Sequence, residues 1–225
     1  MISKERYKIA QEAERSSHVR KKDINILDKR LTSASKIVLP YIRRIESWLN
    51  NNNFSVIDVG SGPTCLGRFF NSPRKAYCDP LMDFYREYYR DKLPRAQGSV
   101  FVKSMAENMP FCDNTFDVAL CYNMLDHSFK PAEIISEIKR VLKPEGYLLL
   151  GIYTHGNILK SLRSLGESLV IFKERPHPYS FTIRGITSML KDYFIIKTCD
   201  MVKGKETFFN LKRRFYVLIL QKDLH

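Results

Sequence analysis

The stretch Val56–Phe70, with the sequence VIDVGSGPTCLGRFF, decides the fold class of this chain. A short apolar run leads into Asp58, and Gly60 and Gly62 follow before a segment with the character of a helix. A buried strand that turns through glycines into a helix is typical of the first unit of a parallel α/β sheet, where ligands bind beyond the carboxyl ends of the strands. We therefore expect Gly60 and Gly62 to lie at a ligand site.

The glycine spacing indicates which class of ligand fits. A dinucleotide site has a third glycine three positions after the second, and Cys65 stands there in this chain. A ligand with a nucleoside and an amino acid group, but no pyrophosphate, needs only the permissive backbone of Gly60 and Gly62 and amides at the start of a helix. S-adenosylmethionine is such a ligand, although the two glycines alone are shared by several kinds of nucleotide site.

Strands and helices alternate along most of the chain, which is typical of βαβ units and a parallel sheet. Pro40 is expected to begin a new helix, because apolar residues then recur on one helical face as far as Leu49. Strands are expected at 54–59, 74–78, 99–103, 116–121, 147–153, 193–199 and 214–221. Helices are expected at 3–15, 24–39, 40–49, 64–72, 81–92, 130–142, 157–170 and 182–191.

This order of elements predicts an α/β fold with a helical cap at residues 1–50 and one domain at residues 51–225. Residues at about 154–180 interrupt the alternation, and we expect them to form an insertion over the edge of the sheet at which ligands bind. The chain has 225 residues, of which 44% are hydrophobic. It can therefore bury a substantial core, and its length suits one domain with additions.

The N-terminal segment is charged and lacks the apolar stretch of a signal peptide, and no apolar run approaches the roughly 20 residues that span a bilayer. We expect a cytoplasmic protein without a membrane span. The five cysteines are scattered and never spaced as C-x-x-C. They are interpreted as reduced thiols, and no metal site is expected.

Positive charge is concentrated at the two ends of the chain. Residues 1–50 hold 12 basic and 6 acidic side chains, residues 51–150 hold 12 and 12, and residues 151–225 hold 13 and 6. Such a distribution favours an anionic partner for whatever the two ends build. The alternative is a solvated basic surface that only aids solubility.

The second expected strand ends in KAYCDP, which places Asp79 at a strand tip, 21 residues after Asp58. A carboxylate at this point can accept hydrogen bonds from both hydroxyls of a ribose. The alternative is that Asp79, which precedes Pro80, starts the next helix.

Three further segments resemble the class I S-adenosylmethionine-dependent methyltransferases, in particular a broad group with an AENLPF loop, an NxLDH segment and an RVLKPGG turn. In this chain they read SMAENMPF, FDVALCYNMLDH and RVLKPEG. The resemblance covers about residues 54–153, with a weaker echo in HPYSFT at 177–182. It implies S-adenosylmethionine as cofactor and a Rossmann-like, seven-stranded, mostly parallel sheet with an antiparallel last strand and helices on both faces.

The resemblance also implies roles for single residues. The methionine portion of the cofactor is assigned Asp58, Gly60, Gly62 and Asn123, the ribose is assigned Asp79, and the adenine is assigned Met105 and Ala106. Two positions depart from the family pattern. Thr64 replaces the usual third glycine, and Met105 replaces an aspartate that bonds the adenine amino group in many relatives. Adenine selection would then depend on backbone groups and Glu107.

Asp126 and His127 follow the fourth expected strand, beside the predicted position of the methyl group. A base is needed if the acceptor is a hydroxyl, and histidine takes protons near neutral pH, so this pair is the predicted catalytic site. The alternative is that Asp126 caps the following helix and His127 only packs. His155, His177 and Tyr179 flank the insertion and are predicted to contact the acceptor.

Three functions are compatible with the sequence. The first is O-methylation of a small or glycan-type acceptor that is anionic or linked to phosphate. The second is methylation of RNA, which the basic ends suit, although no separate RNA-binding module is evident. The third is binding of S-adenosylmethionine without transfer, since a fold alone does not establish catalysis.

Overall fold

The computed structural model describes residues 4–20, 24–94, 98–155, 179, 181–203 and 213–224. The strands are β1 (Ser55–Val59), β2 (Arg74–Cys78), β3 (Ser99–Val102), β4 (Phe116–Tyr122), β5 (Leu142–Thr154), β6 (Phe194–Lys203) and β7 (Arg214–Lys222). The helices are α1 (Lys4–Arg20), α2 (Ile24–Leu49), α3 (Met82–Tyr88), α4 (Pro131–Val141) and α6 (Ile183–Lys191), with short 3-10 turns η1 (Leu66–Phe69) and η2 (Leu125–His127).

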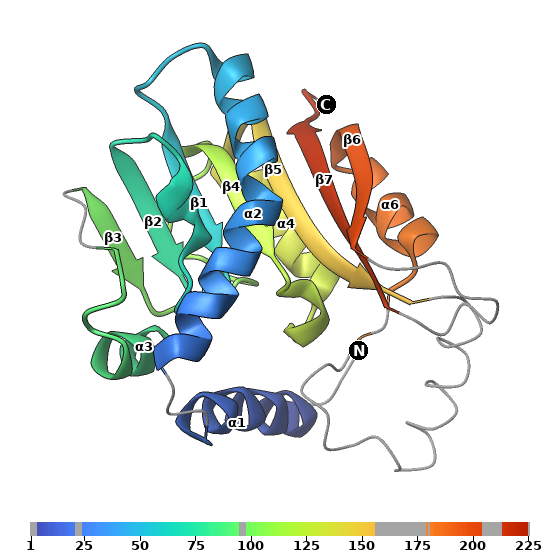
Figure 1. The fold of residues 1–225 in the computed structure, drawn as a ribbon. Helices are drawn as coiled ribbons and strands as arrows, with labels where there is room; N and C mark the ends of the chain where they lie inside the picture. The colour runs from blue at the N-terminus through green and yellow to red at the C-terminus, as the bar shows by residue number, and fades with distance from the viewer. Residues whose placement is uncertain are drawn as a thin grey trace.

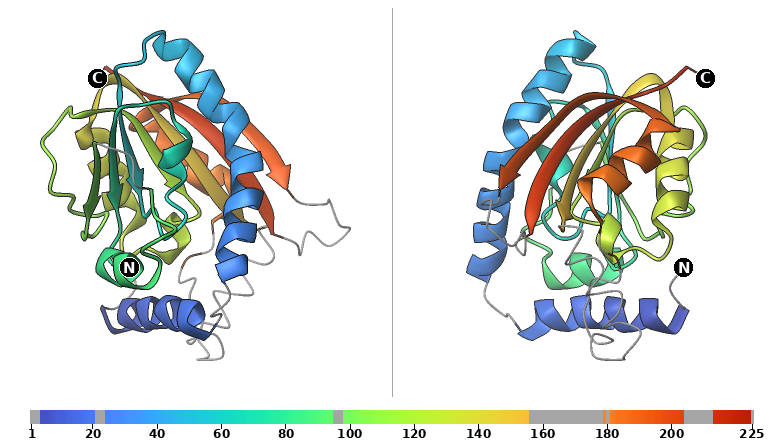
Figure 2. Two further views of the ribbon diagram at one scale, coloured as in Figure 1. Left: turned by 60° about the vertical axis from the view of Figure 1, so that its left-hand side comes forward. Right: turned by 90° about the vertical axis from the view of Figure 1, so that its right-hand side faces the viewer.

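The strands form one sheet in the order β3-β2-β1-β4-β5-β7-β6 (Figure 1). Neighbours from β3 to β5 pair in parallel, and β7 is antiparallel to both β5 and β6. Helix α2 covers one face of the sheet, and α4 and α6 cover the other (Figure 2). The predicted α/β fold, with a mostly parallel seven-stranded sheet and an antiparallel last strand, is therefore confirmed.

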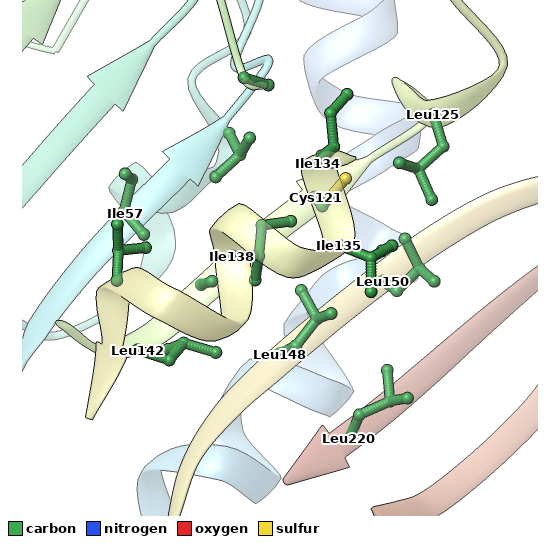
Figure 3. Packing of buried hydrophobic residues seen from close by; sticks show 14 of the residues in the cluster. Ile57, Cys121, Leu125, Ile134, Ile135, Ile138, Leu142, Leu148, Leu150 and Leu220 are labelled. Carbon is green, nitrogen blue, oxygen red and sulfur yellow. The ribbon is translucent and has the colours of Figure 1, made fainter. Parts of the chain in front are cut away.

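Alternate residues of the central strands point to opposite faces of the sheet, as the period of an extended chain requires. Ile57, Leu148 and Leu150 belong to the buried cluster under α4 and α6 (Figure 3). Val56 and Leu149, each one residue away, belong to the cluster under α2. The sheet is thus buried on both faces, which is why its central strands are almost continuously apolar.

The prediction that a new helix begins at Pro40 is wrong, because α2 runs through this residue without a break. Pro40 cannot donate a hydrogen bond to the carbonyl of Lys36, but both residues are exposed, so water can satisfy that carbonyl. Residues on both sides of the proline pack into one cluster against the sheet, and this packing outweighs the local cost. They are Val38, Tyr41, Ile42 and Ile45.

Two other elements differ from expectation. The helix expected at 64–72 is only the short turn η1, and Cys65 before it has a left-handed backbone with a φ of 45°. The turn expected at RVLKPEG is instead an irregularity in the pairing of β5 with β4. Phe116 pairs with Leu142, and the next pair is Val118 with Tyr147. The helix expected at 157–170 lies outside the described residues.

Helix α1 and the first half of α2 extend past the carboxyl ends of the parallel strands (Figures 1 and 2). The second half of α2 packs on the sheet through buried residues such as Ile42 and Ile45. Helices α1 and α2 therefore cover both a face of the sheet and the edge where ligands bind in this kind of fold. The division of the chain at residue 50 stays a prediction.

Asp58 fixes the turn that follows β1. Its side chain is buried, and its Oδ2 accepts a hydrogen bond from the backbone amide of Gly67 at 2.8 Å. Burial raises the pKa of the Asp58 carboxyl to about 7, although the bond from Gly67 opposes this shift. The folded chain therefore holds the proton of this carboxyl more tightly than the unfolded chain does.

The raised pKa predicts how stability depends on pH. Between the unfolded pKa of about 4 and the folded pKa of about 7, only the folded state keeps this proton. The contribution of Asp58 to the free energy of unfolding therefore falls as pH rises through this range, and it is constant at higher pH. Asp58→Asn keeps an oxygen that can accept the hydrogen bond from Gly67, but asparagine does not titrate. We therefore expect the free energy of unfolding of this variant to decline less with rising pH, by on the order of a few kcal/mol. Urea unfolding at about pH 5 and about pH 8 measures it. Parallel pH profiles for the two proteins would contradict the prediction.

Candidate functional site

A cavity of about 610 Å³ lies at the carboxyl ends of the parallel strands. Its floor is formed by the segments that follow β1, β2, β3 and β4, and its cover is formed by α1 and the first half of α2. This is where ligands bind in open α/β sheets. The volume is in the range of sites for small molecules and cofactors.

The two glycines after β1 have different structural roles. Gly60 and Gly62 have φ values of +65° and +50°, in the left-handed region that residues other than glycine seldom adopt. A Cβ at Gly60 would collide with the side chain of Met124, so Gly60 allows close packing. A Cβ at Gly62 would meet no atom within 4 Å. Gly62 therefore leaves open space at the cavity, where a ligand can approach the backbone.

Backbone hydrogen bonds hold this loop against the tip of β2. The amides of Gly60 and Ser61 both donate to the carbonyl of Cys78, at 2.8 and 3.2 Å. The amide of Cys65 donates to the carbonyl of Ser61 at 3.1 Å, which closes a turn before η1. The loop is thus fixed before any ligand binds.

Asp79 joins the loop after β1 to the start of α3. Its Oδ2 accepts a hydrogen bond from the amide of Gly62 at 3.0 Å, and its Oδ1 accepts one from the amide of Leu81 at 2.8 Å. The hydrogen bond from Leu81 is what we expect if Asp79 starts the next helix. The hydrogen bond from Gly62 is a further contact, which ties Asp79 to the glycine loop. Each carboxylate oxygen can accept a second hydrogen bond, so a ribose in the cavity could also be bound.

The segment after β3 meets helix α1. The hydroxyl of Tyr7 on α1 donates to the Sδ of Met105 at 3.3 Å, and Ala106 lines the cavity. Glu107 also lines the cavity, but its Oε1 accepts hydrogen bonds from the backbone amides of Phe129 and Lys130, at 2.9 and 3.0 Å. Glu107 therefore holds the start of α4, which is the role that one interpretation of the sequence gave to Asp126.

Asn123 stands at the end of β4 with a φ of 55°, a conformation that asparagine tolerates better than most residues. Its amide donates to the carbonyl of Gly151 at 2.7 Å, and its side chain lines the cavity. The side-chain Oδ1 is buried and has no hydrogen-bond partner. A ligand that brings an N–H donor would satisfy this oxygen.

The structure brings His127 and Asp126 together on η2. His127 lines the cavity and its side chain is 20% exposed, whereas Asp126 is buried beside it. The distance from His127 Nε2 to Asp126 Oδ1 is 3.8 Å, too long for a hydrogen bond but close enough for attraction between an imidazolium and a carboxylate. The catalytic role of this pair stays a prediction.

Two of the three residues predicted to contact the acceptor lie within the described part of the chain, and neither lines the cavity there. The Tyr179 hydroxyl donates to the carbonyl of Phe129 at 2.8 Å. His155 is buried at the end of β5, and its Nε2 accepts a hydrogen bond from Nε of Arg213 at 3.1 Å. His177 lies outside the described residues. The acceptor contacts of all three stay predictions.

Several lining residues were not identified from the sequence. Tyr122 and Tyr153 stand at the ends of β4 and β5, and the ring of Tyr122 lies where Gly151 has no side chain, since a Cβ there would be 2.5 Å from it. One face of α2 also lines the cavity, with residues at helical spacing that could have been recognised: Leu27, Arg30, Ala34 and Ile37. Tyr7 and Gln11 of α1 had no such signal.

The charges of the lining favour a positively charged group. Within the described lining there are three carboxylates, on Glu14, Asp79 and Glu107, and Arg30 is the one lysine or arginine. A sulfonium or an ammonium group is therefore better matched than a phosphate to this part of the cavity.

Among the described residues, no group of three or more histidine, cysteine, aspartate or glutamate side chains could hold a metal ion. No described helix has the length and apolar character needed to cross a bilayer.

Comparison with known proteins agrees with this geometry. Residues 58–150 match a family model described as a methyltransferase domain. An uncharacterized protein of Methanocaldococcus jannaschii is 28% identical over 119 residues, which are 52% of this chain and 48% of that protein. An uncharacterized methyltransferase of Mycolicibacterium gilvum is 24% identical over 120 residues, which are 53% of this chain and 47% of that protein. The chain thus spans about half the length of the curated relatives it matches.

The fold has counterparts among solved structures. The crystal structure of a SAM-dependent methyltransferase from Methanosarcina mazei superposes with a TM-score of 0.59 and 22% identity, over 78% of this chain and 95% of that one. The family match covers the strand β1 tip, the glycine loop, Asp79 and Asn123, which surround the cavity. Residues 58–150 are therefore similar to a methyltransferase domain, and the chain has the fold of this S-adenosylmethionine-dependent methyltransferase.

Proposed function

We propose that the protein transfers a methyl group from S-adenosylmethionine to an oxygen of a small or glycan-type acceptor that carries negative charge. One observation carries the cofactor part of this proposal. The open side of Gly62, the carboxylate of Asp79 and the unpartnered Oδ1 of Asn123 all meet at a single cavity. These are groups that a ligand with a ribose and an ammonium group can use.

The lining fits the parts of this cofactor. In this proposal Asp79 accepts hydrogen bonds from the ribose hydroxyls, and the Oδ1 of Asn123 accepts one from the ammonium group, because both side chains line the cavity. The excess of carboxylates in the described lining suits the positive sulfonium. When bound, S-adenosylmethionine supplies a methyl group that its sulfonium has already activated for displacement. The protein then has mainly to position the acceptor, which accounts for much of catalysis in such a reaction.

His127 is the proposed general base for an acceptor hydroxyl. It lines the cavity, and its backbone amide donates to the carbonyl of Met124, one residue after Asn123, at 2.9 Å, so it lies near the proposed methionine end. An imidazole nitrogen takes the hydroxyl proton as the acceptor oxygen attacks. The buried carboxylate of Asp126, 3.8 Å from Nε2, then stabilises the imidazolium. This role depends on the imidazole of His127, so a substitution that removes the imidazole is expected to remove the role.

The proposed acceptor site is the part of the cavity that Tyr122, Tyr153 and Ile37 line, since these three residues also pack against one buried cluster. Aromatic faces with hydroxyl groups at their edges suit a ring that has both apolar and polar parts, as a sugar does. The anionic character of the acceptor is proposed from the charge of the chain ends. Residues 156–178 alone contain four lysines or arginines and two glutamates.

RNA is the second candidate acceptor, because basic chain ends also suit a polyanion. Binding of the cofactor without transfer is the third possibility, since the fold hosts more than one function. The experiments below separate these three.

The first prediction from the proposed function concerns the cofactor. We expect calorimetry to show binding of S-adenosylmethionine and S-adenosylhomocysteine but not NAD, because Cys65 replaces the glycine of a dinucleotide site. Asp79→Ala should weaken this binding by about 1 to 3 kcal/mol, the cost of losing a buried hydrogen-bonded carboxylate. Asp83→Ala, which removes an exposed carboxylate paired with Lys103, is the matched control and should have no effect. Tight binding of NAD without binding of S-adenosylmethionine would overturn the proposal.

The second prediction concerns the proton. Metabolite profiling of a deletion strain identifies the acceptor as the unmethylated species that accumulates. With that acceptor, His127→Ala should lower kcat by about 100-fold while the affinity for S-adenosylhomocysteine stays nearly unchanged. Lys130→Ala, at the start of the helix that follows His127, is the control. An unchanged kcat would assign His127 to structure or simple positioning.

The third prediction separates a small acceptor from RNA by salt. A small acceptor meets one or two charges, so raising salt from about 50 to about 200 mM should raise its Michaelis constant by less than about tenfold. RNA that contacts six or more phosphates would lose on the order of a hundredfold to a thousandfold in affinity, because counterions are released. An acceptor constant that does not respond to salt at all would show that the basic ends are only a solvated surface.

A further inference from the structure

Gln11 of α1 carries a polar atom that the protein alone does not satisfy. Its side chain lines the cavity, and its Oε1 is buried without a hydrogen-bond partner. A buried amide oxygen without a donor costs free energy, so such atoms in proteins are almost always paired with protein, water or a ligand. Because Gln11 belongs to the cavity wall, a molecule bound in the cavity can supply the missing donor.

The neighbours of Gln11 show which part of the cavity it faces. One turn before it, Tyr7 donates to Met105 Sδ at 3.3 Å, and its ring lies 5.7 Å from that of Phe129. One turn after it, the guanidinium of Arg15 lies 5.3 Å from the ring centre of Phe84 on α3. Helix α1, which lines the cavity, thus runs from the segment after β3 to α3. It lies beyond the carboxyl ends of the parallel strands (Figure 1). Gln11 is in the middle of this span.

The floor below this span suits a flat base. Pro80, Leu81 and Ala106 line the same cavity as Gln11, and Asp79, the proposed ribose ligand, precedes Pro80 in the chain. A base attached to that ribose therefore lies between the segments after β2 and β3, beneath α1. Carboxamides are well suited to adenine, because they pair an acceptor with its amino group and a donor with a ring nitrogen.

Met105, three residues after β3, cannot readily perform this task. Met105 has a thioether, which is a weak acceptor, and its sulfur already accepts a hydrogen bond from Tyr7. The Oε1 of Glu107 accepts two backbone amides at the start of α4. Of the side chains on this side of the cavity, Gln11 has the buried acceptor without a partner.

We propose that Gln11 recognises the adenine of the cofactor by accepting a hydrogen bond at Oε1 from its exocyclic amino group. Helix α1 then acts as a specificity element that closes over the base, rather than only as a cover. This inference rests on the proposed function, because it takes S-adenosylmethionine as the ligand of the cavity.

A double-mutant cycle between the residue and the ligand tests the inference. The probes are S-adenosylhomocysteine and its analogue with purine in place of adenine, which has a hydrogen where the amino group stands. For the unaltered protein, calorimetry should show binding of the analogue about three- to tenfold weaker, the loss expected for one hydrogen bond. Gln11→Leu should weaken binding of S-adenosylhomocysteine by a similar factor and bind both probes equally.

Two further variants keep the test decisive. Gln11→Glu retains an acceptor at this position and should still prefer S-adenosylhomocysteine over the analogue. Glu12→Ala, an exposed neighbour on the same helix, should leave both affinities unchanged. If Gln11→Leu unfolds, Gln11→Ala replaces it. A preference that persists undiminished in the leucine or alanine variant overturns the role of Gln11, whereas a lack of binding of both probes to the unaltered protein overturns the proposed function itself.

Discussion

The left-handed backbone at Gly60 and Gly62 is the constraint on which the rest of the site depends. It turns the chain sharply at the end of β1, so that the loop lies against the tip of β2 and the amide of Gly62 reaches the Asp79 carboxylate at 3.0 Å. Together with the hydrogen bonds from the amides of Gly60 and Ser61 to the carbonyl of Cys78, this contact fixes the ends of β1 and β2 relative to each other. Asn123 at the end of β4 adds to this preformed floor, which lowers the entropic cost of binding a ligand. Asp58 is buried, does not line the cavity and supports the turn through its hydrogen bond from Gly67.

The cover of the cavity follows from the length of α2. Its second half is anchored by Ile42 and Ile45 in the core, so its first half projects past the strands and turns another stretch of the same face toward the cavity. Among the side chains that the structure describes, α1 is held by contacts such as those of Tyr7 with Met105 and Phe129, and none of its residues belongs to the buried clusters. A rigid floor with a more lightly held cover is suited to a site that must admit a cofactor and then enclose it.

Much of the fold could be predicted from the sequence, because the central strands are apolar runs that end in glycine, aspartate or asparagine, and these signals are local. The path of α2 through Pro40 could not be, since core packing on both sides of the proline outweighs its local preference. The site was predictable where a motif marks it, as at Gly62, Asp79 and Asn123. Gln11 was not predictable, because α1 is mostly polar without a marked apolar face, and only the tertiary arrangement brings this residue to the cavity.

The central claim is that the space beside Gly62 is occupied by the cofactor, and the substitution Gly62→Ala tests it most directly. The added Cβ meets no protein atom within 4 Å, so it should cost only the modest strain of a left-handed alanine in thermal unfolding. The account predicts that the folded variant loses at least about tenfold in affinity for S-adenosylhomocysteine in calorimetry, because the methyl group and the ligand compete for one space. A folded variant that binds S-adenosylhomocysteine as tightly as the unaltered protein would contradict it.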